Sequence, residues 1–309
     1  MGVEFVQFSL TPILIGTLAA IACALPGNFL ILRRQALIGD AISHVVLPGI
    51  VVAFLLTGTV AAIPMLLGAG AAALLAVILI EAIRRVGQIE PGAAMGVVFT
   101  ALFAGGVLLL EHSDTSSVHL DVDHALMGNL ETLIWLRATD GWASLTDAAA
   151  LAHLPPELGR MAVTAALITA LTVIFWRPLK LSTFDEGFAR AIGLPVSAIG
   201  LALVIAAAVA AVAAFDAVGS IIVIAMFICP PAAARLMTNS LSVQVWLSVA
   251  FATLSAVLGY VLAGYGPIWL GYANAVSAAG MIATVSGLIL GLACLVGPHR
   301  RRAGIAAGA

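Results

Sequence analysis

The sequence predicts an all-α polytopic membrane protein with about nine transmembrane helices. Of its 309 residues, 62% are hydrophobic and only 9% are charged, whereas soluble domains carry about a quarter charged residues. The mean hydropathy is +1.17, and long runs without Asp, Glu, Lys or Arg recur along the chain. About 20 apolar residues suffice for a helix to cross the hydrocarbon core. We therefore expect membrane lipid, and no nucleic acid, around this chain.

The uncharged runs locate the spans in order along the chain. Run 5–32 holds one span, and run 41–80 holds two, with a turn near 57–64. Single spans follow, and they lie in 91–110, 161–176, 193–215 and 217–234. The last run, 236–299, must hold two helices that are broken around "AGYGPIWLG".

Positive charges predict the orientation, because Lys and Arg accumulate on the cytoplasmic side. With the N-terminus outside, only Arg137 and Arg160 of the 13 basic residues fall outside. Nine spans then place the C-terminal "RRR" in the cytoplasm. The start, "MGVEFVQF", lacks a basic segment, so we expect it to begin the first span and not a cleaved signal peptide.

Two polar interruptions divide this predicted single transmembrane domain, 1–309. The outer polar loop, about 111–160, carries eight acids and four of the six histidines. The inner interruption, between spans five and six, predicts a short cytoplasmic helix over 184–192. Thr183 and Glu186 form a capping-box pattern before it, and Gly193 suits a left-handed helix end after it.

The short inner helix is amphipathic. Phe184 and Phe188 share one face, and Asp185, Glu186 and Arg190 surround it. Because a helix outside the bilayer has no evident packing role here, we expect a partner to dock on it. The alternative is a helix lying on lipid headgroups, although its acids argue against an anionic surface.

Asp40 and His44, in "GDAISHVVLPG", are the candidate metal ligands inside a span. Their i, i+4 spacing places both on one helix face, so they offer one oxygen and one nitrogen ligand. A second copy of the chain would complete two carboxylates and two imidazoles. The alternative is that Asp40 pairs with an arginine or caps the helix at the cytoplasmic interface, while His44 bonds a neighbouring span. We favour the metal pathway, because ionisable groups inside spans usually have functions.

The outer polar loop contains "EHSDTSSVHLDVDH", with seven possible metal ligands in 14 residues. We prefer to interpret it as a solvated acidic loop. If it captures metal, Asp121 and His124 are the first candidates, followed by His119 and Asp123.

Four ordered segments carry a resemblance to a known family. They are "LILRRQALIGDAISHVVLPGIVVAFLL", "ALMGNL", "FDEGFARAIGLPV" and "VGSIIVIAMFICPPAAARLM". Together they are similar to the membrane permeases of ABC importers for zinc, manganese and iron. Met127 stands where the family usually has Phe, and the segment 259–280 departs from the usual pattern, so no role is carried over to it.

The resemblance implies a permease homodimer around a central pathway in the bacterial inner membrane. It implies two ATP-binding cassette subunits beneath and a soluble metal-binding protein outside. The short inner helix would then be the coupling helix, with the ATPase contacts Phe184, Asp185, Glu186, Phe188, Arg190 and Gly193. The sole lysine, Lys180, lies in no glycine-rich loop, so this chain cannot itself carry a phosphate-binding loop of the G-x-x-x-x-G-K-[ST] type.

Three functions compete at this stage. The first is the transport subunit of an ATP-driven importer, not an enzyme, with a divalent metal as cargo and no permanent cofactor. The second, an intramembrane metalloenzyme, lacks an H-E-x-x-H motif and a third ligand within a span. The third, a proton-coupled secondary transporter or channel, usually needs several buried relays. Carboxylate and imidazole accept zinc, manganese and ferrous iron alike, and we favour zinc.

Overall fold

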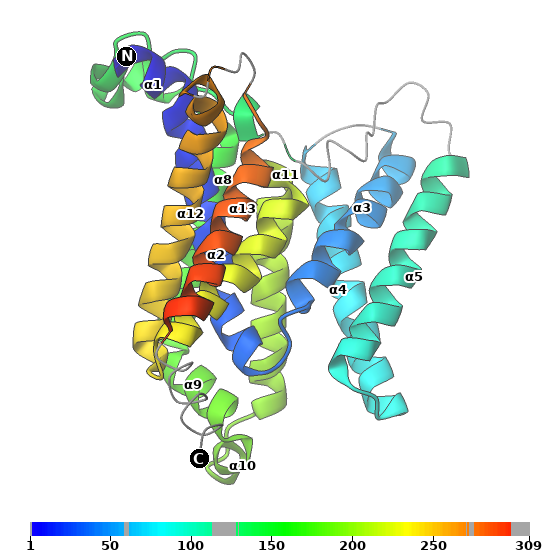
Figure 1. Ribbon diagram of the computed structural model, residues 1–309. Helices are drawn as coiled ribbons and strands as arrows, with labels where there is room; N and C mark the ends of the chain where they lie inside the picture. Colours follow the sequence, from blue (N-terminus) through cyan, green and yellow to red (C-terminus); the bar gives the residue numbers. More distant parts are fainter. Residues whose placement is uncertain are drawn as a thin grey trace.

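The computed structural model consists of long helices, most of them running along one common direction (Figure 1). It describes residues 2–58, 62–112, 128, 130–269, 271 and 275–297. No β-strand occurs within these ranges. This confirms the predicted all-α class.

The N-terminal span is built from three consecutive segments, α1 (Gly2–Phe5), the π-helical η1 (Val6–Leu10) and α2 (Thr11–Leu32). They form one apolar run of 31 residues. At its far end, the N–H of Gln35 donates to the main-chain oxygen of Leu30 at 2.8 Å. This hydrogen bond closes the end of α2 in a tight turn, from which the next helix starts directly.

Three helices form a group on one side of the molecule: α3 (Ile38–Thr57), α4 (Ala62–Gly87) and α5 (Pro91–His112) (Figure 1). α3 crosses α4 at Gly49 and Gly68, where a Cβ on either glycine would overlap the main-chain oxygen of the other. Such close crossings of small residues are common in membranes, where van der Waals packing drives helix association.

A small cluster caps the end of the molecule that holds the N-terminus (Figure 1). It includes the short segments η2 (Leu130–Thr132), η3 (Gly141–Thr146) and α7 (Ala148–Leu151). Its core is Val6, Trp135, Ala138 and Ala150, and the indole N–H of Trp135 donates to the main-chain oxygen of Ala150 at 2.9 Å. Following the predicted orientation, we call this the outer end and the opposite end the inner end.

α8 (Pro156–Ile174) leads the chain from the outer end to the inner end, where α9 (Trp176–Phe184) and α10 (Glu186–Ala191) lie (Figure 1). α8 matches the predicted span 161–176 closely. α9 was not predicted as a separate helix.

α11 (Val196–Met237) is a 42-residue element that reverses direction. Its only non-helical residue is Gly219, with φ 79° and ψ 171°. The first half rises from the inner end and the second half returns to it (Figure 1). Near the turn, the carboxylate of Asp216 forms an ion pair with Arg160 of α8, with 2.7 Å between Oδ2 and Nη2. The two predicted spans 193–215 and 217–234 are therefore the two arms of one reversed element.

α12 (Leu241–Trp269) and α13 (Ala278–Val296) are the last two helices. They cross at Gly259, whose Cβ position is filled by the backbone of Ile282. The break predicted around "AGYGPIWLG" lies at the end of that segment, since α12 runs through Pro267 and ends at Trp269.

The main core lies where α2 packs against α11, with α12 and α13 beside them. Eight helices in the described ranges are long and apolar enough to span a membrane. α11 counts once in that number although it contains two arms, which agrees with the nine predicted spans. The orientation, with the N-terminus outside and the C-terminus in the cytoplasm, stays a prediction.

Candidate functional site

Asp40 and His44 lie side by side on α3, as their spacing predicts. The imidazole Nε2 of His44 is 3.3 Å from the Oδ1 of Asp40, and each side chain is a little over one quarter exposed. Asp40 also lies in the first turn of α3, where the helix dipole stabilises a negative charge. The pair therefore presents a carboxylate and an imidazole that remain accessible.

The ring of His44 is held by two aromatic side chains of α5. It stacks on Phe99 at 5.5 Å between ring centroids and meets the edge of Phe103 at 5.7 Å. These contacts fix the plane of the imidazole. Neither phenylalanine was predicted as part of the site, because nothing in the sequence indicates which residue of α5 faces α3.

The pair lies within the helical bundle and not at its inner edge. Gly39 abuts Phe227, since a Cβ on Gly39 would overlap the phenyl ring. Phe227 is ten residues before Met237, the inner end of α11, and ten helical residues span roughly 15 Å. Within the described ranges, Asp40 pairs with His44 and not with an arginine. The alternative of an arginine pair at the cytoplasmic interface is therefore not what the structure shows.

One chain supplies only part of a metal coordination shell at this point. No group of three or more His, Cys, Asp or Glu side chains comes together within the described ranges. Two ligands suit a transient site for a passing ion better than a closed structural site, which takes four ligands. A second copy of the chain or cargo-bound water would have to supply the rest.

The candidate outer ligands Asp121, His124, His119 and Asp123 lie outside the residues that the structure describes. Their role in metal capture stays a prediction.

The short inner helix exists, but its N-cap and its start differ from the prediction. α9 extends through Thr183 to Phe184, so Thr183 is not the cap. The cap is Asp185, in an extended conformation with φ −145°, whose carboxylate accepts the N–H of Phe188 at 2.8 Å. The predicted helix 184–192 therefore corresponds to α10, which starts two residues later, after α9 has ended at Phe184.

Apolar side chains in α10 and on either side of it are exposed. Because Phe184 belongs to α9 and Asp185 interrupts the helix, Phe184 and Phe188 do not share one helix face as predicted. Phe184, Phe188 and Ile192 are each about half exposed. On the other side of the helix, Arg190 and Glu186 form an i, i+4 ion pair at 3.0 Å. Gly193 ends the element with φ +83°, which confirms the predicted left-handed helix end.

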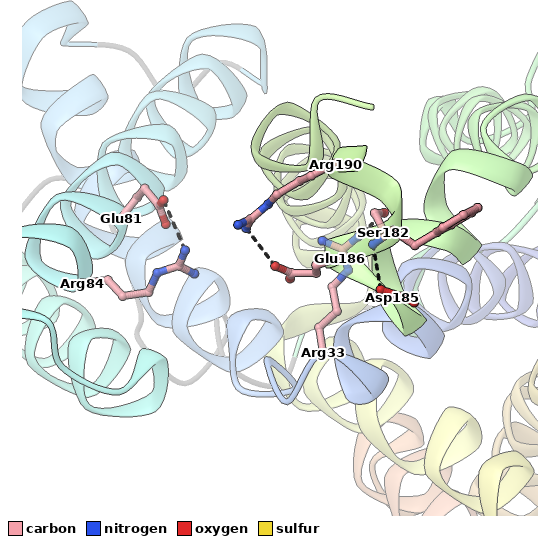
Figure 2. A network of polar contacts seen from close by, with 8 residues as sticks. Arg33, Glu81, Arg84, Ser182, Asp185, Glu186 and Arg190 are labelled. Carbon is pink, nitrogen blue, oxygen red and sulfur yellow. Dashed lines mark hydrogen bonds and ion pairs between the residues drawn. The ribbon is translucent and has the colours of Figure 1, made fainter. Parts of the chain in front are cut away.

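A cleft of about 640 Å³ lies at the inner end, between α4 on one side and α10 and α11 on the other. Figure 2 shows the charged side chains around it: Glu81 and Arg84 of α4, paired at 3.4 Å, face the Arg190–Glu186 pair across the opening. Arg33 also lines this cleft. Its guanidinium donates from Nη2 to Ser182 Oγ at 2.7 Å and from Nε to Thr183 Oγ1 at 3.1 Å.

The contact of Arg33 with Ser182 and Thr183 could not be predicted from the sequence, in which Arg33 indicates only the orientation of the chain. The partners are 149 and 150 residues apart in sequence. The only indication of this contact in the sequence is the hydroxyl of Thr183 in a polar segment. The capping-box pattern led us to expect that hydroxyl at a helix N-terminus instead.

Comparison with known proteins places these features in a family. The sequence pattern of the ABC 3 transport family matches residues 5–138 and 149–297, and these ranges include α3, α9 and α10. The manganese transport system membrane protein MntD of Bacillus subtilis is 38% identical over 283 residues, which cover 92% of this chain and 90% of MntD. The zinc transport system membrane protein TroD of Treponema pallidum is 35% identical over 287 residues, or 93% of this chain and 73% of TroD.

Among solved structures, a chain of PsaBC from Streptococcus pneumoniae, in complex with a Fab, matches with a TM-score of 0.74. It is 28% identical, and the match covers 97% of this chain and 95% of that chain. Sequence pattern, relatives and fold thus agree over nearly the whole chain, which belongs to the ABC 3 transport family.

Proposed function

We propose that this chain is the membrane-spanning subunit of an ATP-driven importer for divalent transition metals in a bacterial inner membrane. The observation that carries the proposal is the Asp40–His44 pair, 3.3 Å apart and accessible within a membrane helix. Carboxylate and imidazole are ligands that zinc, manganese and iron all accept. In a member of this family, the pair would give the metal ion a binding site within a span along its path.

The cargo is proposed to meet the pair only in passing. Two ligands from one chain bind weakly, and conduction requires a site from which the ion can leave. In a homodimer, the second copy brings another Asp40 and His44 to complete the shell. Zinc is our first candidate and manganese the second; the names of relatives include both metals.

ATP hydrolysis is assigned to a separate ATP-binding cassette subunit that docks on α10. The open apolar side chains Phe184 and Phe188 would enter a pocket of that subunit, and Asp185, Glu186 and Arg190 would form its polar rim. Gly193 would let the chain turn back into α11. A soluble metal-binding protein is proposed to deliver the cargo at the outer end.

Uptake of labelled zinc and manganese into vesicles tests the proposal. The chain is co-expressed with its ATP-binding subunit, and the delivery protein is supplied outside. We expect uptake that needs ATP and disappears with an ATP-binding subunit that cannot hydrolyse it. If uptake persists without hydrolysis and follows an imposed proton or metal gradient, the chain is a secondary transporter or channel and the proposal is wrong.

A further inference from the structure

Arg33 joins the two parts of the molecule that the proposed function requires to communicate. It is the residue directly after α2, and it lies seven positions before Asp40. Its guanidinium contacts the last turn of α9, directly before the cap of α10. Figure 2 shows it beside Ser182 and Glu186, at the inner end of the cleft.

The acceptors of Arg33 are rigidly placed. Ser182 is 1% exposed, and its hydroxyl is also 3.3 Å from the main-chain oxygen of Leu179. On its other side, the guanidinium lies against Gly200 of α11, where a Cβ would come within 3.1 Å of Nη1. Burial lowers the pKa of Arg33, and the nearby negative charge of Glu186 opposes that change. A planar guanidinium that donates to two hydroxyls at once cannot be replaced equally by a lysine ammonium.

The turn that carries Arg33 is closed by hydrogen bonds. The N–H of Arg34 donates to Ile31, that of Gln35 to Leu30, and that of Ile38 to Gln35, at 2.8 to 3.1 Å. Arg34 holds the turn in a left-handed conformation with φ +58°. These hydrogen bonds connect the end of α2 to the start of α3, and Asp40 lies in the first turn of α3.

We propose that Arg33 is the positioning residue that couples movement of α10 to the Asp40–His44 pair. When a subunit bound to the exposed side chains of Phe184, Phe188 and Ile192 moves, it displaces Asp185 and the adjoining end of α9. Ser182 and Thr183 pass this displacement to the guanidinium, and the closed turn passes it to α3. This inference rests on the proposed function, since it assumes that α10 receives the ATP-binding subunit.

The test measures transport and hydrolysis together in the assembled transporter. The chain, its ATP-binding subunit and the delivery protein are reconstituted in vesicles, and zinc uptake and ATP hydrolysis are followed in the same sample. For Arg33→Gln we expect the ratio of zinc transported to ATP hydrolysed to fall at least about fivefold, the lower end of typical allosteric coupling. Arg33→Lys should restore part of the ratio, because it keeps the charge but not the two-pronged geometry.

Two further variants separate coupling from folding. Arg34→Gln removes the neighbouring exposed charge but keeps the main-chain hydrogen bond of Arg34 that closes the turn, and should leave the ratio unchanged. The double variant Ser182→Ala, Thr183→Val keeps Arg33 but removes its acceptors, and should lower the ratio to the level of Arg33→Gln. Combined with Arg33→Gln it should add nothing more, because all three changes break one connection.

The outcomes distinguish the two proposals. If the unmodified complex shows no ATP-dependent zinc uptake, the proposed function fails. If it transports and both the Arg33→Gln and the double variant keep the normal ratio, only the role of Arg33 is wrong. A loss of uptake that merely follows the amount of assembled complex, at an unchanged ratio, also overturns the coupling role in favour of a structural one.

Discussion

At the scale of single residues, the sequence predicted which candidate ligands come together but not what surrounds them. The helical spacing of Asp40 and His44 sufficed, because i and i+4 side chains share a face whatever else the fold does. Phe99 and Phe103, which orient the imidazole, come from α5, more than 50 positions along the chain. Contacts between helices depend on how the helices rotate against each other, and a single span of continuous apolar residues carries no signal of that rotation.

Asp40→Asn and His44→Ala test the pathway at this scale. Asn keeps the size of Asp but loses the charge that a metal ion needs, and Ala removes the imidazole. We expect each to lower the initial rate of zinc uptake by tenfold or more, in line with losses of ~10- to 100-fold when groups around a metal are removed.

The matched control is His153→Ala, which removes an exposed imidazole at the outer end. It should transport normally. Variants of Asp40 and His44 that are produced in normal amounts and transport at the normal rate would remove the pair from the pathway.

At the scale of helices, the existence of most elements could be predicted and several of their ends could not. The capping-box pattern at Thr183 was misleading because Asp185, two residues later, is also a strong N-cap residue. The hydroxyl of Thr183 instead accepts from Arg33, a partner that no local pattern reveals. α12 passes through Gly264, Gly266 and Pro267 without a break, because lipid offers no hydrogen bonds to an interrupted backbone and so favours continued helix.

Asp185→Ala tests the cap of α10. Loss of an N-cap costs about 1 kcal/mol, which corresponds to roughly fivefold weaker binding of a partner that needs the formed helix. We expect this weakening when the ATP-binding subunit is titrated onto the purified chain.

Asp185→Asn serves as the control, since Asn caps as well as Asp while carrying no charge. If both variants weaken binding equally, the carboxylate acts through its charge and not through the cap.

Gly219→Ala tests the reversal of α11. The combination φ 79°, ψ 171° lies in a region that is essentially reserved for glycine, and a side chain there costs about 1 to 3 kcal/mol. We expect a lower melting temperature of the purified protein in detergent.

Gly70→Ala, in α4, is the matched change, because its added Cβ meets nothing within 4 Å and alanine favours a helix. Equal melting temperatures for the two variants would mean that α11 can reverse without a glycine.

At the scale of the whole molecule, composition predicted the class and charge predicted the orientation. The uncharged runs correspond to the long apolar helices of the structure, because a charge in hydrocarbon is costly and is therefore rare in a membrane span. The order in which the helices pack could not be predicted, and neither could the separate group of α3, α4 and α5. The interpretation of 1–309 as a single domain stays a prediction.

The orientation can be tested with single cysteines. Cys23, Cys229 and Cys294 are replaced by alanine, and a cysteine is introduced by Thr139→Cys at the outer end or by Ala191→Cys in α10; both positions are exposed. A membrane-impermeant maleimide should label the first in intact cells and the second only in inverted vesicles. The reverse labelling pattern would invert the topology and contradict the positive-inside assignment.

The ion pair between Arg160 and Asp216 has a consequence for how the protein is made. With the predicted orientation, the turn of α11 brings Asp216 across the bilayer during synthesis, and an aspartate at the centre of an inserting helix costs about 2.5 to 3.5 kcal/mol. Arg160, at the start of α8, has by then left the ribosome, because it precedes Asp216 by 56 positions. The 2.7 Å pair thus joins the carboxylate to a counter-charge on a helix that is synthesised before α11.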